Sequence, residues 1–223
     1  MAQNNAINKK SGSLTIDPGS SGDSWLQHNI NTTGEFRIGI DDGSGDTFNI
    51  ATGSAITSSD PFIIDANGHL RLQDQPCFAA KTSSDKTNVT GDGTAYTVIW
   101  DTSIFDNNSD FNTGTGTFTA PVTGKYYLIA KGTINCPVGG GDTMEVKIVT
   151  SNRTYTGSAG PLQNQVANYI GGNNWISHTF GVLADMDATD TATVTVTDAG
   201  GAKTDDFEGG SNVRSGFYGV LIC

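Results

Sequence analysis

Positive charge is scarce in this sequence. Twelve lysine and arginine residues stand against 23 aspartate and glutamate residues, which gives a formal net charge of −11 at pH 7. Proteins draw most of their affinity for a nucleic-acid backbone from lysine and arginine contacts to phosphates, so we expect no nucleic-acid partner. The same charge repels anionic surfaces at long range. A partner on a cell surface must therefore be held by short-range polar contacts or by a bridging cation.

Long apolar runs are absent as well. The sequence has no window of about 18 consecutive apolar residues, so we expect no insertion into a membrane. Residues 1–10 are polar and lack the apolar segment of a secretory signal peptide. This predicts that the protein is made and folded in a cytoplasm.

Catalytic signatures are missing too. The three histidines stand in unrelated contexts, and there is no His-Glu-x-x-His pattern, Gly-x-Ser-x-Gly elbow, Walker loop or dinucleotide-binding fingerprint. We therefore expect a protein without enzymatic activity. One alternative stays open, because a pair of carboxylates that cleaves a glycosidic bond is defined by a three-dimensional separation.

Cysteine is rare, and Cys77, Cys136 and Cys223 are the only three. They cannot all pair within one chain, and their spacing matches neither a zinc site nor a Cys-x-x-Cys redox motif. Each lies in or beside an apolar run, where a free cysteine behaves as a small hydrophobic residue. We predict three buried, unpaired thiols and no metal at them.

Turn formers and β-branched residues are abundant. The chain has 29 glycines, only 16% charged residues and many Thr, Ser and Asn, a composition that predicts an all-β fold. Before residue 76 the apolar alternation comes in short pieces separated by turn sequences such as Asn67-Gly68, the pair preferred in a two-residue type I′ hairpin. The pieces are Leu14 to Ile16, Phe36 to Ile40, Phe48 to Ile50, Phe62 to Ile64 and Leu70 to Leu72.

Residues 1–75 supply few inward apolar side chains, too few for one copy to fold alone. Several copies side by side would bury each other's apolar faces and pair the open strand edges. We therefore predict that residues 1–75 form an N-terminal attachment segment and a short trimeric β-rich shaft.

Residues 76–223 contain longer runs, and we predict that they form a separate domain. Eight candidate strands separated by Gly-, Asn- and Asp-rich turns predict an antiparallel jelly-roll β-sandwich without helices. These strands are Cys77 to Lys81, Ala95 to Trp100, Gly116 to Thr119, Lys125 to Thr133, Thr143 to Thr150, Trp175 to Leu183, Ala192 to Thr197 and Ser215 to Ile222. Residues 160–174 are assigned to a loop.

One stretch of this second part carries a family resemblance. The row Phe118-Thr119-x-Pro121-Val122-x-Gly124-x-Tyr126-Tyr127, with the closing strand Ser215 to Ile222, resembles the globular head of complement component 1q. That head is a trimeric jelly roll shared with the tumour necrosis factor superfamily. The resemblance implies a homotrimer with aromatic and aliphatic side chains along its axis. The candidates for that interface are Tyr126, Leu128, Phe217 and Tyr218.

The first part carries a second resemblance. Phe36 to Asp42, Phe48-x-Ile50 and Phe62 to Leu72 resemble shaft segments of bacteriophage tail fibres, in which a shaft precedes a distal head. This implies that the N-terminus docks to other virion proteins and that apolar shaft residues meet between copies. The candidates for that contact are Phe36, Ile38, Ile40, Ile64, Leu70 and Leu72.

Acidic turns suggest a cation, because several carboxylates in one loop offer the oxygen ligands that Ca²⁺ takes. The clusters are Asp41, Asp42 and Asp46; Asp185, Asp187 and Asp190; and Asp205, Asp206 and Glu208. The alternative is that Asp favours turns and the surface is simply acidic. The second interpretation is favoured at each turn, so no metal ligand is assigned. Ca²⁺ is the only cofactor considered, and the remaining candidates for it are Asp185, Asp187, Asp190, Asp205 and Asp206.

Loop aromatics with amide groups suit sugars, since rings stack on the pyranose face and amides satisfy its hydroxyls. The candidates are Tyr169, Asn173, Asn174 and Trp175, with Asp205 to Asn212 as a second loop.

Together with the two resemblances, these features predict a homotrimeric virion fibre, made in the cytoplasm of a host bacterium, whose head binds a host surface glycan. A structural capsid or neck decoration fibre is the main alternative, and a spore-surface or secreted trimer is another.

Overall fold

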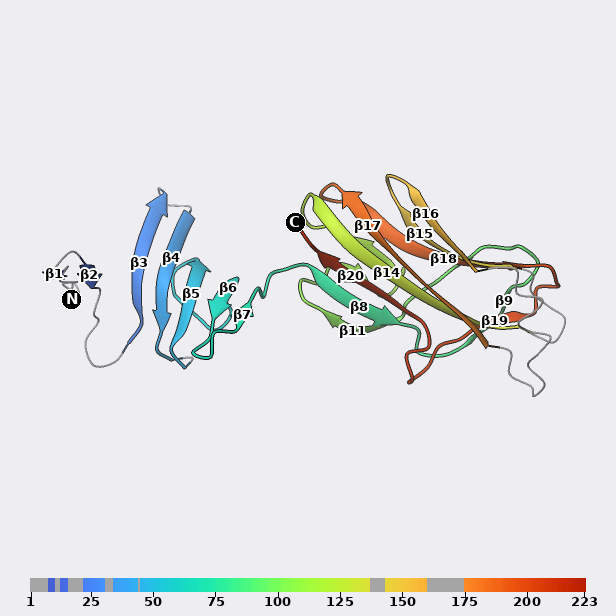
Figure 1. The fold of residues 1–223 in the computed structure, drawn as a ribbon, viewed down its shortest axis with the longest axis horizontal. Helices are drawn as coiled ribbons and strands as arrows, with labels where there is room; N and C mark the ends of the chain where they lie inside the picture. The colour runs from blue at the N-terminus through green and yellow to red at the C-terminus, as the bar shows by residue number, and fades with distance from the viewer. Residues whose placement is uncertain are drawn as a thin grey trace. The chain divides into compact units, whose positions relative to one another are not determined.

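The computed structural model describes residues 8–10, 13–15, 22–30, 34–43, 45–136, 143–159 and 175–223. All regular structure in these residues is β-strand, which confirms the all-β prediction (Figure 1). Since the described residues form no helix, none of them offers a helical span that could cross a membrane. The chain divides into two compact units, residues 1–75 and residues 76–223, which we call the N-terminal unit and the head.

The N-terminal unit is built around a five-stranded antiparallel meander in the order β3-β4-β5-β6-β7. Its strands are β3 (Ser24–Ile30), β4 (Gly34–Asp41), β5 (Thr47–Thr52), β6 (Phe62–Ile64) and β7 (Leu70–Arg71), and a separate hairpin pairs β1 (Asn8–Lys10) with β2 (Ser13–Thr15). Strand β3 was not predicted, because the polar residues Gln27, His28 and Asn29 interrupt its alternation. It forms because it pairs along its whole length with β4.

The turn between β6 and β7 differs from the predicted two-residue type I′ turn. Gly68 has a φ of +83°, whereas Asn67 is not in the left-handed region. The amide of Gly68 donates to the carbonyl of Asp65 (2.9 Å), and the Asp65 carboxylate accepts from the amides of Asn67 and His69. The type I′ prediction is therefore wrong, since the Asp65 side chain favours a longer turn that ends on a left-handed glycine.

One face of this meander is covered by the segment between β5 and β6. Asn49 is fully buried, and its Nδ2 donates to the carbonyl of Thr57 and to the Asp60 carboxylate, both at 2.8 Å. Ala51 and Ile63 are buried on the same side. The interior of the unit thus consists of a few apolar side chains and a polar network, which agrees with the thin core expected from the sequence.

The head consists of two antiparallel sheets (Figure 1). The β14 sheet contains β8 (Cys77–Lys81), β9 (Lys86–Thr90), β11 (Thr102–Asp106), β14 (Gly124–Asn135), β17 (Trp175–Met186), β19 (Asp205–Phe207) and β20 (Gly216–Leu221). The β18 sheet contains β10 (Tyr96–Thr97), β12 (Phe111–Asn112), β13 (Thr117–Thr119), β15 (Thr143–Thr150), β16 (Thr154–Ala159) and β18 (Thr191–Ala199).

Each of the eight predicted runs contains a strand, and the jelly-roll prediction is confirmed. Five strands of the head that the sequence did not indicate are β9, β11, β12, β16 and β19. They are short or mostly polar, and each forms by antiparallel pairing with a neighbouring strand. The predicted loop over residues 160–174 lies outside the described residues.

The core lies between the two sheets and is centred on aromatic rings. Phe78 stacks on Phe111 and Phe118 at centroid distances of 4.8 and 4.7 Å and meets the edge of Phe217 at 5.1 Å. Trp100 is fully buried against Phe217. Rings packed at these separations and tilts contribute beyond the area that they bury.

Strand alternation places the predicted axis residues inside this core. Tyr126, Leu128 and Phe217 are all 0% exposed within one chain, so the prediction that they line a subunit interface is wrong. The sequence showed that Tyr126-Tyr127 and Phe217-Tyr218 must each send one ring inward. The structure shows that the first ring of each pair is the inward one, because the Tyr126 phenol reaches the Val122 carbonyl (2.7 Å) and Phe217 completes the aromatic cluster.

Gly219 on β20 lies against closely packed side chains of this core. A Cβ atom at Gly219 would lie 2.3 Å from Cε1 of Phe78 and 2.9 Å from Cδ2 of Leu128. We therefore expect Gly219→Ala to lower the free energy of unfolding of the head by about 1–3 kcal/mol, because the core must shift to admit one methyl group. Urea unfolding followed by tryptophan fluorescence measures this.

The matched control is Gly114→Ala. A Cβ atom there would approach only Oδ1 of the exposed residue Asn112, at 3.2 Å, and we expect a change within about 0.5 kcal/mol. Equal unfolding midpoints for the two variants would contradict the packing described here.

Candidate functional site

The solvent side of the β14 sheet is apolar. Strand register places Leu183 beside Tyr127, Tyr127 beside Val220, and Val220 beside Cys77. In a second row of the same face, Ile129 of β14 lies beside Tyr218 of β20. We define the outer apolar face as Phe105, Tyr127, Ile129, Leu183, Tyr218 and Val220, from four strands.

Several of these side chains are strongly exposed. Leu183 is 58% exposed, Phe105 48% and Tyr127 42%, while Ile129 and Tyr218 are half-buried. At one end of the face Lys125 forms an ion pair with Asp185, and at the other end lies Lys131. An apolar centre with a charged margin is the arrangement found in protein interfaces.

The N-terminal unit has an apolar exposed face of its own. Along β4 the residues Phe36, Ile38 and Ile40 lie on the side opposite the buried network, and Ile40 aligns through Phe48 with Ile64 and Leu70. Leu70 is 54% exposed, whereas Ile64 is half-buried. The six residues proposed for the shaft contact, which also include the exposed Leu72, remain a prediction.

Of the predicted receptor-binding residues, Tyr169, Asn173 and Asn174 lie outside the described residues. Trp175 begins β17 and is 44% exposed. The Arg214 guanidinium lies over its ring, 3.7 Å from the centroid, and also forms a 2.7 Å ion pair with the buried Glu208. Trp175 is thus an exposed ring held in place by a cation that is itself fixed by a buried carboxylate.

The second predicted receptor loop, Asp205 to Asn212, is largely wrong. Asp205, Phe207 and Glu208 are almost completely buried, because β19 pairs with β9 and β14. Only Ser211 and Asn212 of that stretch are exposed.

The acidic turns do not gather their carboxylates. The Asp190 carboxylate accepts from the side chains of Ser151 and Asn152 and from the amide of Asp187. The hydrogen bond from Ser151 is the main reason that the pKa of Asp190 lies below its usual range. Asp185 instead pairs with Lys125. Protein donors therefore bind these carboxylates separately, as the alternative that Asp favours turns leads one to expect.

The other two acidic turns also have carboxylates that accept hydrogen bonds from protein amides. Asp42 accepts from the amide of Gly22, and Asp206 accepts from the amide of Asn88. Within the described residues, one group of three side chains of metal-binding type does converge. It consists of Cys136, Asp198 and Asp205, which we call the core acidic cluster.

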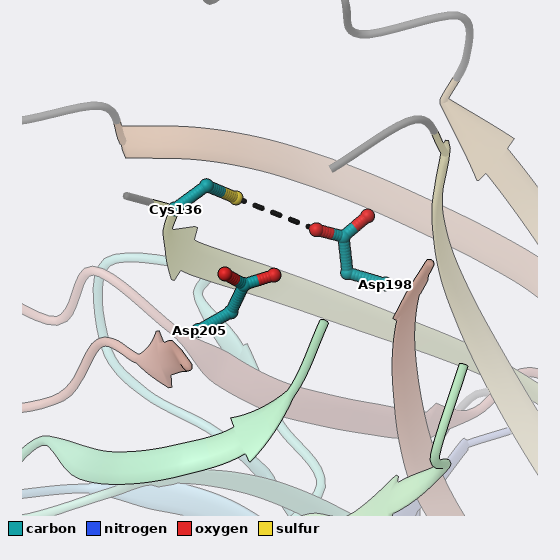
Figure 2. Close-up of side chains that lie close together, drawn as sticks. All are labelled: Cys136, Asp198 and Asp205. Atoms are coloured by element: carbon teal, nitrogen blue, oxygen red, sulfur yellow. Dashed lines mark hydrogen bonds between the residues drawn. The ribbon is translucent and has the colours of Figure 1, made fainter. Parts of the chain in front are cut away.

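Figure 2 shows the three side chains of the core acidic cluster turned toward one another. Cys136 follows β14, Asp198 lies in β18 of the opposite sheet, and Asp205 begins β19. Their exposures are 1%, 0% and 1%. One ligand atom from each lies within 4.8 Å of the others, and the Cys136 thiol donates to Oδ2 of Asp198 across 3.5 Å.

The two carboxylates of this cluster differ in their hydrogen bonds, and neither is in an ion pair of the described residues. Oδ1 of Asp198 accepts from the Ala199 amide (2.9 Å), but both carboxylate oxygens of Asp205 are buried without a hydrogen-bond partner. Burial, followed by the neighbouring Asp198, raises the pKa of Asp205 to about 8. Burial and then the charges of Asp205 and Asp198 raise the pKa of the Cys136 thiol. None of the ion pairs among the described residues involves either carboxylate.

Local sequence patterns hardly indicated that these three residues converge. Cys136 was expected to be a buried free thiol, and it is, whereas Cys77 is half-buried and Cys223 exposed, so burial of all three is wrong. One feature of the sequence does indicate that Asp198 points into the core. Asp198 continues the alternation of Val194 and Val196, whose side chains point into the core.

No protein-family model and no curated protein matches the chain. Among solved structures, the chain is similar to the globular domain of zebrafish complement 1qA, with 16% identity over 67% of this chain and 98% of that one and a TM-score of 0.46. It is also similar to murine APRIL at pH 8.0, with 12% identity over 67% and 100% and a TM-score of 0.47. The jelly-roll assignment rests on the strand order and register of the head itself.

Arg214 is expected to stabilise the head because Glu208 is 3% exposed and depends on it for charge compensation. Arg214→Ala should lower the free energy of unfolding by about 1–3 kcal/mol, since it leaves a buried carboxylate unpaired. Urea unfolding measures this. The double variant Arg214→Ala/Glu208→Gln should recover part of the loss.

Lys147→Ala serves as the control, because its ion pair with Glu145 lies on the surface with about a third of each side chain exposed. We expect an effect of at most about 0.5 kcal/mol. A loss as large as that of Arg214→Ala would show that burial of Glu208 is not the cause.

Proposed function

We propose that this protein is the subunit of a homotrimeric virion fibre. In this proposal three heads associate through the outer apolar face, the N-terminal unit forms a trimeric shaft and docks to other virion proteins, and the head binds a glycan on a host bacterium. The observation that carries the proposal is the exposure of Leu183, Phe105 and Tyr127 on one face of one sheet. Contiguous exposed apolar surface of this kind marks an interaction site.

The energetics favour association through this face. Burying apolar surface contributes about 25 cal/mol per Å², and a fully buried Leu or Phe side chain contributes about 1.5–3 kcal/mol. Each chain carries a net charge of −11, so copies repel one another at long range. A homotrimer must therefore be held by apolar contact, which is the chemistry that this face offers.

The N-terminal unit supports a fibre rather than a globular oligomer. Its interior is small, and Phe36, Ile38 and Leu70 expose apolar surface on a single-layered sheet. Copies that cover this surface for one another would supply the missing core. The resemblance of residues 36–72 to tail-fibre shafts supports the same role and a place on the virion.

The glycan part of the proposal is supported by Trp175. An exposed tryptophan offers a flat apolar surface to a sugar ring, and Arg214 limits the ring's freedom to reorient. A preorganised aromatic side chain loses less entropy on binding.

The trimer part is tested with Leu183→Glu. An unpaired carboxylate in an apolar interface costs several kcal/mol, so we expect the variant to associate at least about 100-fold more weakly than the original chain. Sedimentation velocity and equilibrium over a concentration series measure this.

Thr156→Glu adds the same charge at an exposed position on the β18 sheet, and we expect it to stay trimeric. If both variants sediment alike, the outer apolar face is not the interface. A stable monomer of the original chain at all concentrations would overturn the fibre proposal as a whole.

The receptor part is tested with Trp175→Ala. We expect trimeric protein to bind cells of a susceptible strain within a bacterial panel, and this variant to bind at least tenfold more weakly because it loses the stacking surface. Fluorescently labelled trimer, competed with purified surface polysaccharide, measures binding. Thr156→Ala on the opposite sheet should bind normally.

A trimer that binds none of the strains, or one whose binding polysaccharide does not compete, would contradict the receptor role. It would leave a particle-decorating fibre as the better account of the same trimer.

A further inference from the structure

The core acidic cluster brings ligand atoms from three strands and both sheets of the head into one place. Two ligands on one tetrahedral zinc lie about 3.4–3.6 Å apart when the bond lengths are about 2.3 Å to sulfur and about 2.1 Å to oxygen. Sγ of Cys136 and Oδ2 of Asp198 are 3.5 Å apart. The third ligand atom, from Asp205, lies within 4.8 Å of both, so a movement of about 1 Å would bring it to the same spacing.

Asp205 is the second and independent observation. It is 1% exposed, and neither of its carboxylate oxygens has a hydrogen-bond partner. The chain passes close beside it, since a Cβ atom at Gly91 would lie 2.9 Å from Oδ2 of Asp205. A buried polar group without a partner is costly, and a native fold compensates it with a proton, a water molecule or a cation.

Within the described residues, no cationic side chain forms an ion pair with Asp205. Thr90 is buried next to the cluster, but its hydroxyl donates to the carbonyls of Thr94 and Asp198 and accepts from the Asp198 amide. These bonds fix the backbone that carries Asp198. None of these bonds involves the carboxylate of Asp205. No ion pair among the described residues supplies that carboxylate with a positive charge.

We propose that Cys136, Asp198 and Asp205 bind a divalent transition-metal ion, with Zn²⁺ the ion that their chemistry fits best. A thiolate ligand selects Zn²⁺ over the hard cations Ca²⁺ and Mg²⁺, and carboxylate oxygens complete a mixed set that zinc accepts. Three protein ligands leave one position of a tetrahedral ion for water. The site shares only Asp205 with the acidic turns considered for Ca²⁺ from the sequence, and its other two ligands come from elsewhere in the chain.

Binding replaces protons by the metal. The Cys136 thiol releases its proton to solvent and coordinates as a thiolate, and any proton held on Asp205 is released likewise. The divalent ion then offsets two of the three buried ligand charges and ties β18 of one sheet to β14 and β19 of the other. Because the unfolded chain does not hold these residues together, metal binding stabilises the folded head.

The test uses the full chain, purified with a chelator, dialysed and titrated with Zn²⁺ alone. We expect one ion per chain by native mass spectrometry and calorimetry and an increase of the melting temperature of the head. Co²⁺ should give the near-ultraviolet thiolate charge-transfer absorption and the strong visible bands of a tetrahedral site.

Cys136→Ser and Asp205→Asn should each weaken Zn²⁺ binding at least tenfold, and Cys136→Ser should abolish the thiolate absorption. Asp205→Asn removes a buried charge without changing shape, so it should remain folded, as circular dichroism checks. The matched controls are Cys77→Ser and Cys223→Ser, which remove the other two thiols and should bind like the original chain.

Three outcomes would overturn the proposal: no uptake of Zn²⁺ or Co²⁺, uptake that Asp205→Asn leaves unchanged, or loss of uptake in the Cys77 or Cys223 variant instead. The first outcome would mean that the cluster is a buried part of the core that holds no metal. All three ligands come from one chain, so a dissociated Leu183→Glu variant should bind the metal as well. The metal and trimer proposals therefore fail separately.

Discussion

The structure depends on one constraint: a β-strand presents successive side chains to opposite faces, so each sheet buries one side and leaves the other to be covered by something else. In the head, the two sheets bury one side of each against the cluster around Phe78 and Phe217. The β14 sheet has apolar residues on its second side too. The meander of the N-terminal unit likewise exposes apolar side chains on one of its sides. Both units of this chain therefore carry more apolar sheet surface than one copy can bury.

The same constraint produces the acidic cluster. Strand β18 sends Val194, Val196 and then Asp198 into the space between the sheets, so its alternation continues past the end of the apolar core. Cys136 and Asp205 reach the same place from the other sheet. A carboxylate in such a position is held there by the strand on which it lies, whatever its solvation cost. The pKa of Asp205 is raised for this reason.

Much of the fold could be predicted because period-two alternation is a local signal. The long strands β14, β15, β17 and β18 each show it, and each was predicted close to its observed bounds. Strands β9, β11, β16 and β19 show little alternation of their own and form by pairing with neighbours. The turn at Asp65 to His69 differed for a related reason, because a side-chain carboxylate that accepts two amides decided its length.

By itself, the sequence determined the all-β class, the long strands and the fact that each aromatic pair splits between two faces, since all of these follow from residue type and local periodicity. Only the tertiary structure decided which ring of each pair faces the core, because that phase depends on how Phe78, Phe111 and Phe118 pack from other strands. Convergence of Cys136, Asp198 and Asp205 was likewise beyond the sequence. Residues that far apart in the chain become neighbours only when two sheets close over them.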